Sequence, residues 1–136
     1  MECSARTWRG WKRWSVRAGL LFPFVAVAVY MGISLAVAAG VRAAEEAALR
    51  EFPGDPVAAL IAYVDTSTHS VSERNRAVWA LGQLGDQRAL PVLEKHITGG
   101  KCWHDRELCQ YELQKAARLC RGGSNITALL WRHGVL

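Results

Sequence analysis

The sequence contains none of the short motifs that support catalysis or cofactor binding in many enzymes. A Gly-rich phosphate loop is absent, and no spacing of Ser, His and Asp, or of Cys and His, indicates an activated nucleophile. A Cys-x-x-Cys-His motif is also absent, so covalent attachment of c-type haem is not supported. We therefore expect a protein that is not an enzyme, with no catalytic residue and no cofactor.

The larger part of the chain also has almost no net charge. Residues 42–136 carry twelve Lys and Arg against eleven Asp and Glu, so the formal charge of +5 lies almost entirely in residues 1–41. A nucleic-acid-binding domain usually presents a basic face of its own. We therefore predict no nucleic-acid partner.

Charged residues are missing altogether from residues 18–41, which read AGLLFPFVAVAVYMGISLAVAAGV. A helix of this length covers roughly 36 Å, which exceeds the hydrocarbon core of a bilayer at about 30 Å. The Lys and Arg residues before this run favour a cytoplasmic N-terminus. We predict a single transmembrane helix over 18–41 in a lipid bilayer, with the rest of the chain on the periplasmic or extracellular side.

The N-terminal arm, residues 1–17, is basic and contains Trp8, Trp11 and Trp14 at intervals of three. On a helix these residues share a face that suits the membrane interface. The alternative to an anchor is a cleaved signal peptide, because residues 36–38 (Ala-Val-Ala) resemble a cleavage site. We favour the anchor because the apolar run exceeds the usual length of a signal-peptide core. If the span is cleaved, the remaining protein is secreted.

Residues 74–93 (RNRAVWALGQLGDQRALPVL) predict two helices joined by a tight turn. Ser70 and Glu73 fit a capping box at the start of the first helix. Gly85 suits the left-handed position that ends a helix, and Asp86 suits the cap of the next one. A turn this short packs the two helices as an antiparallel pair. The apolar stripe of the first helix has spacings of three and four: Ala77, Ala80, Leu81 and Leu84.

The same stretch resembles the short HEAT-type repeat, also called the phycobilisome-lyase-like HEAT repeat. The matching residues are Arg74, Ala77, Ala80, Leu81, Gly82, Leu84, Gly85, Asp86, Arg88, Ala89, Leu90, Pro91 and Leu93. The resemblance implies stacked helix pairs that serve as protein-binding scaffolds. Asp55 lies 31 residues before Asp86, and each opens a predicted helix, which agrees with an internal repeat.

We therefore predict an all-α protein: a short α-solenoid of about two and a half HEAT-like helix pairs, preceded by one transmembrane helix. The last half-pair would cover the open end of the stack. The predicted parts are a cytoplasmic arm (1–17), the transmembrane helix (18–41), a helical stalk or linker (42–54) and the repeat domain (55–136). Its predicted helices cover residues 55–64, 71–84, 86–98, 105–120 and 126–133.

Three cysteines fall in the predicted repeat domain. Cys109 and Cys120 lie about 16 Å apart along one predicted helix, so they cannot pair with each other. Cys102 precedes that helix and can fold back onto Cys109, in a compartment that we predict to be oxidising. We predict a disulfide between Cys102 and Cys109; the alternative is reduced cysteines, two of them in the core. The spacing of Cys102, His104 and Cys109 matches no common zinc-binding pattern, so we predict no metal site.

The predicted function is a non-catalytic, membrane-anchored module or scaffold that binds another protein. Trp103 is the predicted partner contact, because it lies in a loop and aromatic anchors dominate interfaces. One alternative is a small accessory subunit of a membrane complex, in which Gly32 and Ala36 would contact a neighbouring helix. Another is an enzyme accessory, by analogy with the bilin lyases that share this repeat, which rests on fold alone.

Overall fold

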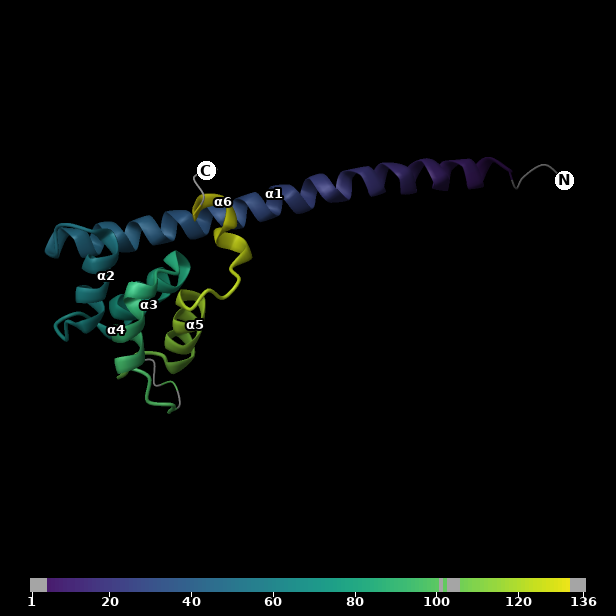
Figure 1. Cartoon of the computed structure of the whole chain (residues 1–136). Helices are drawn as coiled ribbons and strands as arrows, with labels where there is room; N and C mark the ends of the chain where they lie inside the picture. Colours follow the sequence, from purple (N-terminus) through teal and green to yellow (C-terminus); the bar gives the residue numbers. More distant parts are fainter. Residues whose placement is uncertain (1–4, 101, 103–105, 133–136) are drawn as a thin grey trace. The chain divides into compact units, whose positions relative to one another are not determined.

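The computed structural model describes residues 5–100, 102 and 106–132, with side chains from residue 22 onward (Figure 1). Every regular element within these residues is helical, which confirms the predicted all-α class. The chain divides into two units, residues 1–33 and 34–136. The elements are α1 (Ala5–Glu51), α2 (Pro56–Asp65), α3 (Val71–Leu84), η1 (Gln87–Ala89), α4 (Leu90–Lys95), α5 (Gln110–Cys120), η2 (Ile126–Ala128) and α6 (Leu129–Arg132).

The first unit consists of the N-terminal part of α1. Most of its large apolar side chains from Phe22 onward are exposed: Phe22 is 76% exposed and Phe24 is 73% exposed. The stretch Phe22–Glu51 is long enough to cross a membrane, and its most apolar 18 residues have a mean hydropathy of 2.2. By length and composition, one helix is therefore a candidate membrane span, although a signal sequence has the same properties.

The second unit begins within the same helix, at Ser34. One face of α1 is buried from there onward, at spacings of three and four: Ser34, Ala38, Val41, Ala44 and Ala48. Gly40 allows this face to approach α3 closely, because an added Cβ there would lie 3.0 Å from the ring of Trp79. Residues 42–51, which we predict as part of a stalk, thus contribute to the core of the folded unit. Small side chains let two helices pack at short distance. Composition alone does not show which helix packs against such a face.

Helix α2 begins, and helix α3 begins and ends, at the residues that the sequence indicates. The carboxylate of Asp55 caps α2 by accepting the N–H of Ala58 at 2.9 Å. At the start of α3 the Oγ of Ser70 accepts the N–H of Glu73 at 3.3 Å, and the Glu73 carboxylate accepts the N–H of Ser70 at 3.0 Å. Gly85 ends α3 with a φ of 67°. Each of these ends is stabilised by groups within four residues, which is why local sequence predicts them.

The core of the second unit draws one fully buried leucine from each of four helices, namely Leu60, Leu81, Leu93 and Leu113. Helices α3 and α5 approach each other closely at Gly82, where an added Cβ would lie 2.8 Å from the Cα of Ala116. Helix α2 packs against α3 and α4 packs against α5, which gives the two helix pairs that the repeat prediction expects.

Three predicted helices are shorter than expected. A 3-10 turn, η1, precedes α4, and α4 ends at Lys95 rather than at residue 98. Pro91 has no N–H to donate to the preceding turn, so the α-helix begins at Leu90 and does not continue from η1. Helix α5 begins at Gln110 and not near residue 105, with Cys109 as its N-cap. The last segment divides into η2 and the single turn α6, and residue 133 lies outside the described part.

Candidate functional site

Cys102 and Cys109 lie side by side at the N-terminal end of α5. Their Sγ atoms are 2.8 Å apart and share a hydrogen bond in which either thiol can be the donor. Both thiols are free, and their separation exceeds the length of a disulfide bond, about 2.05 Å. The structure therefore brings together the two cysteines that the sequence pairs, while the disulfide itself stays a prediction.

Helices α3 and α5 position this dithiol. The N–H of Cys109 donates to Oδ1 of Asn75 on α3 at 2.9 Å, which ties the start of α5 to that helix. The Sγ of Cys102 accepts the N–H of Tyr111, in the first turn of α5, at 3.3 Å. A helix leaves its first amides without intrahelical partners. The sulfur of Cys102 thus occupies the place that a capping oxygen usually takes, since the side chain of Cys109 makes no capping bond.

The environments of the cysteines differ. The hydrogen bond from Cys109, followed by the N–H of Tyr111, lowers the pKa of the Cys102 thiol. Burial, followed by the bond to Cys102, raises the pKa of Cys109. Cys102 is half-buried, whereas Cys109 is 6% exposed. Cys120 is buried in the core, where it donates to the carbonyl of Leu81, and burial raises its pKa to about 11. Cys102 is therefore the accessible thiol of the three.

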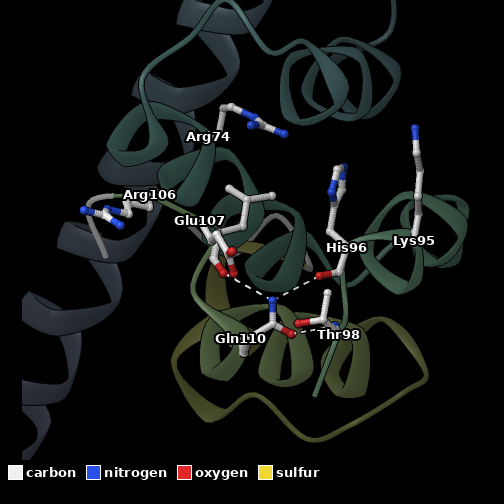
Figure 2. Close-up of a pocket in the computed structure, with 8 residues that line it drawn as sticks. Arg74, Lys95, His96, Thr98, Arg106, Glu107 and Gln110 are labelled. Carbon is white, nitrogen blue, oxygen red and sulfur yellow. Dashed lines mark hydrogen bonds between the residues drawn. The ribbon is translucent and has the colours of Figure 1, made fainter. Parts of the chain in front are cut away.

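A pocket of about 310 Å³ lies next to the dithiol, between α3, the end of α4 and the start of α5 (Figure 2). Its lining residues come from segments far apart in the chain: Arg74, Lys95, His96, Thr98, Arg106, Glu107, Leu108 and Gln110. Those from 106 to 108 belong to the segment that connects the two cysteines. Part of the pocket lining therefore lies between the two cysteines in the chain.

Gln110 forms the base of this pocket and connects its walls (Figure 2). Its side chain is 4% exposed. The Nε2 donates to the carbonyls of His96 at 3.1 Å and Leu108 at 3.3 Å, and the Oε1 accepts the N–H groups of Thr98 at 2.8 Å and Gly99 at 3.3 Å. All of its bonding groups are occupied by backbone, so Gln110 shapes the pocket and is not free to bind a ligand.

The charged residues around the pocket are predominantly cationic. Among its lining residues, Arg74, Lys95 and Arg106 carry permanent positive charge, and Glu107 carries the one negative charge. Asp65, outside the pocket, binds the Nζ of Lys95 at 2.6 Å. That bond is the main cause of the lowered pKa of Asp65. The Arg106 side chain is exposed and lines the pocket, and with Arg74 it gives the pocket a cationic character that suits an anionic group.

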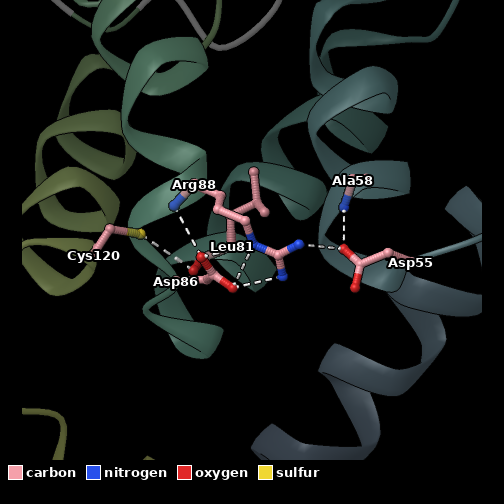
Figure 3. A network of polar contacts seen from close by, with 6 residues as sticks. All are labelled: Asp55, Ala58, Leu81, Asp86, Arg88 and Cys120. Atoms are coloured by element: carbon pink, nitrogen blue, oxygen red, sulfur yellow. Dashed lines mark hydrogen bonds and ion pairs between the residues drawn. The ribbon is translucent and has the colours of Figure 1, made fainter.

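A separate polar network connects the starts of two successive helix pairs (Figure 3). The guanidinium of Arg88 binds Asp86 at 2.8 Å and Asp55 at 3.0 Å, and these carboxylates cap η1 and α2. Arg88 is the main cause of the lowered pKa of Asp86, and the N–H of Ala58 is the main cause of the lowered pKa of Asp55. The carboxylates of Asp55 and Asp86 therefore stay ionised near neutral pH and do not transfer protons there. Their role is to connect the two helix pairs through Arg88.

The structure leaves some predicted site residues undecided. Trp103, the predicted partner contact, and His104 lie outside the described residues. Among the residues that are described, no group of three or more His, Cys, Asp and Glu side chains could hold a metal ion. The pocket was not predicted, because its walls meet only when α3, α4 and α5 pack together.

Comparison with known proteins gives one match. Residues 73–98 match the family model described as PBS lyase HEAT-like repeat. The match covers most of α3 and all of η1 and α4, and it agrees with the resemblance of residues 74–93. No significant match was found among curated proteins or among solved structures. A HEAT-like repeat is typical of helical scaffolds and interaction modules.

Proposed function

We propose that this protein is a non-catalytic interaction module whose HEAT-like unit is anchored in a membrane by α1. The main support is the contrast along α1, where large apolar side chains between Phe22 and Ile33 are exposed and one face of the following turns is buried in a folded core. Exposed apolar surface of this extent marks an interaction site. The uncharged run that contains it, residues 18–41, is long enough to cross a bilayer.

The burial of α1 from Ser34 onward supports a retained anchor over a cleaved signal. Cleavage after Ala38 would remove Ser34 and Ala38, both buried in the second unit. The intact mass of protein purified from membranes distinguishes the two: we expect the full chain, resistant to extraction at high pH. A mature protein that starts after residue 38 and is recovered in the supernatant would contradict the anchor.

The orientation follows from the charges. Basic residues precede the apolar run, so we propose a cytoplasmic N-terminus and a HEAT-like unit on the opposite side. Protease added to sealed vesicles of known orientation tests this arrangement: the unit should be digested only when its side faces outward. If the unit is protected in vesicles whose non-cytoplasmic face is outward, the proposed topology is wrong.

We propose that the partner binds through the pocket beside α5 with a segment that carries carboxylates. Arg74, Lys95 and Arg106 line this pocket together with one acid, Glu107. Lys95 already binds Asp65, and the polar groups of Gln110 are occupied, so the proposal rests on Arg74 and Arg106. Arg106 is the most suitable probe, because it is exposed and none of the hydrogen bonds or ion pairs described above depends on it.

The test is Arg106→Glu in the full-length protein, with Arg118→Glu on the exposed side of α5 as the matched control. Affinity purification from native membranes with quantitative mass spectrometry should recover a defined set of partners with the wild type. We expect Arg106→Glu to reduce their recovery at least tenfold, about 1.4 kcal/mol of binding free energy. The control should recover them fully. Equal recovery with both variants would remove the pocket as the binding site.

An accessory role in a larger membrane complex is the second candidate. The observation that favours it is Gly32, around which an added Cβ would find no atom within 4 Å, so this side of α1 is open to another helix. Native electrophoresis in mild detergent distinguishes the two roles: a stable high-mass band that persists in Arg106→Glu but is lost in Gly32→Leu favours the accessory subunit.

A further inference from the structure

We propose that Cys102 and Cys109 form a thiol–disulfide exchange site, in which Cys102 is the thiol that reacts with an external disulfide. This inference goes beyond a structural cross-link, because it assigns different chemical roles to the two cysteines. It is also independent of whether the neighbouring pocket binds a partner.

The geometry separates the roles. Cys102 is half-buried and its Sγ accepts the N–H of Tyr111, so a negative charge on this sulfur is stabilised by an amide at a helix N-terminus. Cys109 is buried behind it, and its N–H is bound to Asn75. An external disulfide therefore meets Cys102 first, and the Sγ of Cys109 stands 2.8 Å behind the atom that has reacted.

The exchange takes place in two steps with a disulfide of the general form R–S–S–R. The thiolate of Cys102 attacks one sulfur, which forms a mixed disulfide on Cys102 and releases one R–S⁻. Cys109 then loses its proton to solvent and attacks the Sγ of Cys102, which releases the second R–S⁻ and closes the intramolecular bond. The two cysteines lose two electrons together, and R–S–S–R gains them as two thiols. Reduction reverses both steps, with Cys102 again the accessible sulfur.

Oxidation would act on the wall of the pocket. The bond between Cys102 and Cys109 closes a covalent ring that contains Arg106, Glu107 and Leu108. These three residues line the pocket. Closure removes conformations of this segment, so its amide hydrogens should exchange more slowly in the oxidised protein, whereas those of α2 should not change. Equal exchange of this segment in both redox states would contradict the effect on the pocket wall.

The first experiment uses the full-length protein in mild detergent and a series of glutathione redox buffers, followed by acid quenching and alkylation. Mass spectrometry of peptides then gives the free fraction of each cysteine. Cys102 and Cys109 should lose alkylation in parallel as the buffer becomes oxidising, while Cys120 remains reduced. Independent titration of the two cysteines, or full alkylation of both in every buffer, would overturn the proposal.

The second experiment tests the division of roles. Cys109→Ser should trap glutathione on Cys102, because serine has nearly the size of cysteine and keeps the N–H that binds Asn75 but cannot close the bond. In Cys102→Ser, attachment of glutathione to Cys109 should be at least tenfold slower, and Cys120→Ser should behave as the wild type. Equal rates for Cys102 and Cys109 would overturn the assignment. Should a variant fail to fold, the initial alkylation rates in the reduced wild type decide the same question, with Cys102 expected to react fastest.

Discussion

The two parts of α1, residues 22–33 and residues 34–51, are both rich in apolar side chains but place them differently. In the first part the side chains are large, and most are at least half exposed, as for Phe22 and Val29. In the second part the buried face is made mainly of small residues, with Ala48 completely buried. Large apolar side chains suit contact with lipid chains, whereas small ones let another helix approach. The size of the apolar side chains, large where they are exposed in the first part and small on the buried face of the second, distinguishes the two environments.

The largest effect is expected from placing the same charge in each part. Val41→Asp buries a carboxylate in the core and should lower the free energy of unfolding of the second unit by about 4 kcal/mol. Val29→Asp should leave that unfolding unchanged but weaken membrane insertion by about 3 kcal/mol. Thermal unfolding in detergent and extraction at high pH measure the two effects separately. If Val29→Asp unfolds the unit as strongly as Val41→Asp, the contrast between the two parts fails.

A smaller effect is expected from a matched pair of glycine substitutions. Gly40→Val pushes into the ring of Trp79, 3.0 Å from an added Cβ, and should lower the free energy of unfolding by about 1–2 kcal/mol. Gly32→Val meets no atom within 4 Å, so the stability of the second unit should remain within about 0.5 kcal/mol of wild type. Denaturant titration of both variants makes the comparison. Equal losses would mean that Gly40 has no special packing role.

The smallest effect concerns pH and should be confined to the second unit. The pKa values of Asp55, Asp65 and Asp86 are lowered in the folded protein by their hydrogen bonds and cations. A lowered folded pKa contributes stability above the unfolded value of about 4, which is lost as pH falls through the folded value. The Tm of the second unit should therefore decline by a few degrees below about pH 4. Residues 22–33 contain no carboxylate, so their helical signal in circular dichroism should persist. A constant Tm down to pH 2 would contradict this.

The helix ends could be predicted because their causes are local. The cap at Asp55, the capping box of Ser70 and Glu73, and the left-handed Gly85 each act within about one turn of helix. The same applies in part to the dithiol, because Cys102 lies seven residues before Cys109, the residue at the start of α5. Which of the two thiols is exposed depends on contacts with α3, such as the bond to Asn75, that no local pattern contains.

By itself, the sequence determined the helical class, the repeat between Asp55 and Asp86 and the apolar character of α1. Each of these depends on the order of neighbouring residues, which pattern and composition record directly. Only the tertiary structure decided that the repeat unit extends back to Ser34 and that a cationic pocket forms beside Gln110. Both arise where helices distant in the chain meet, and the burial of a side chain is a property of the surface that covers it.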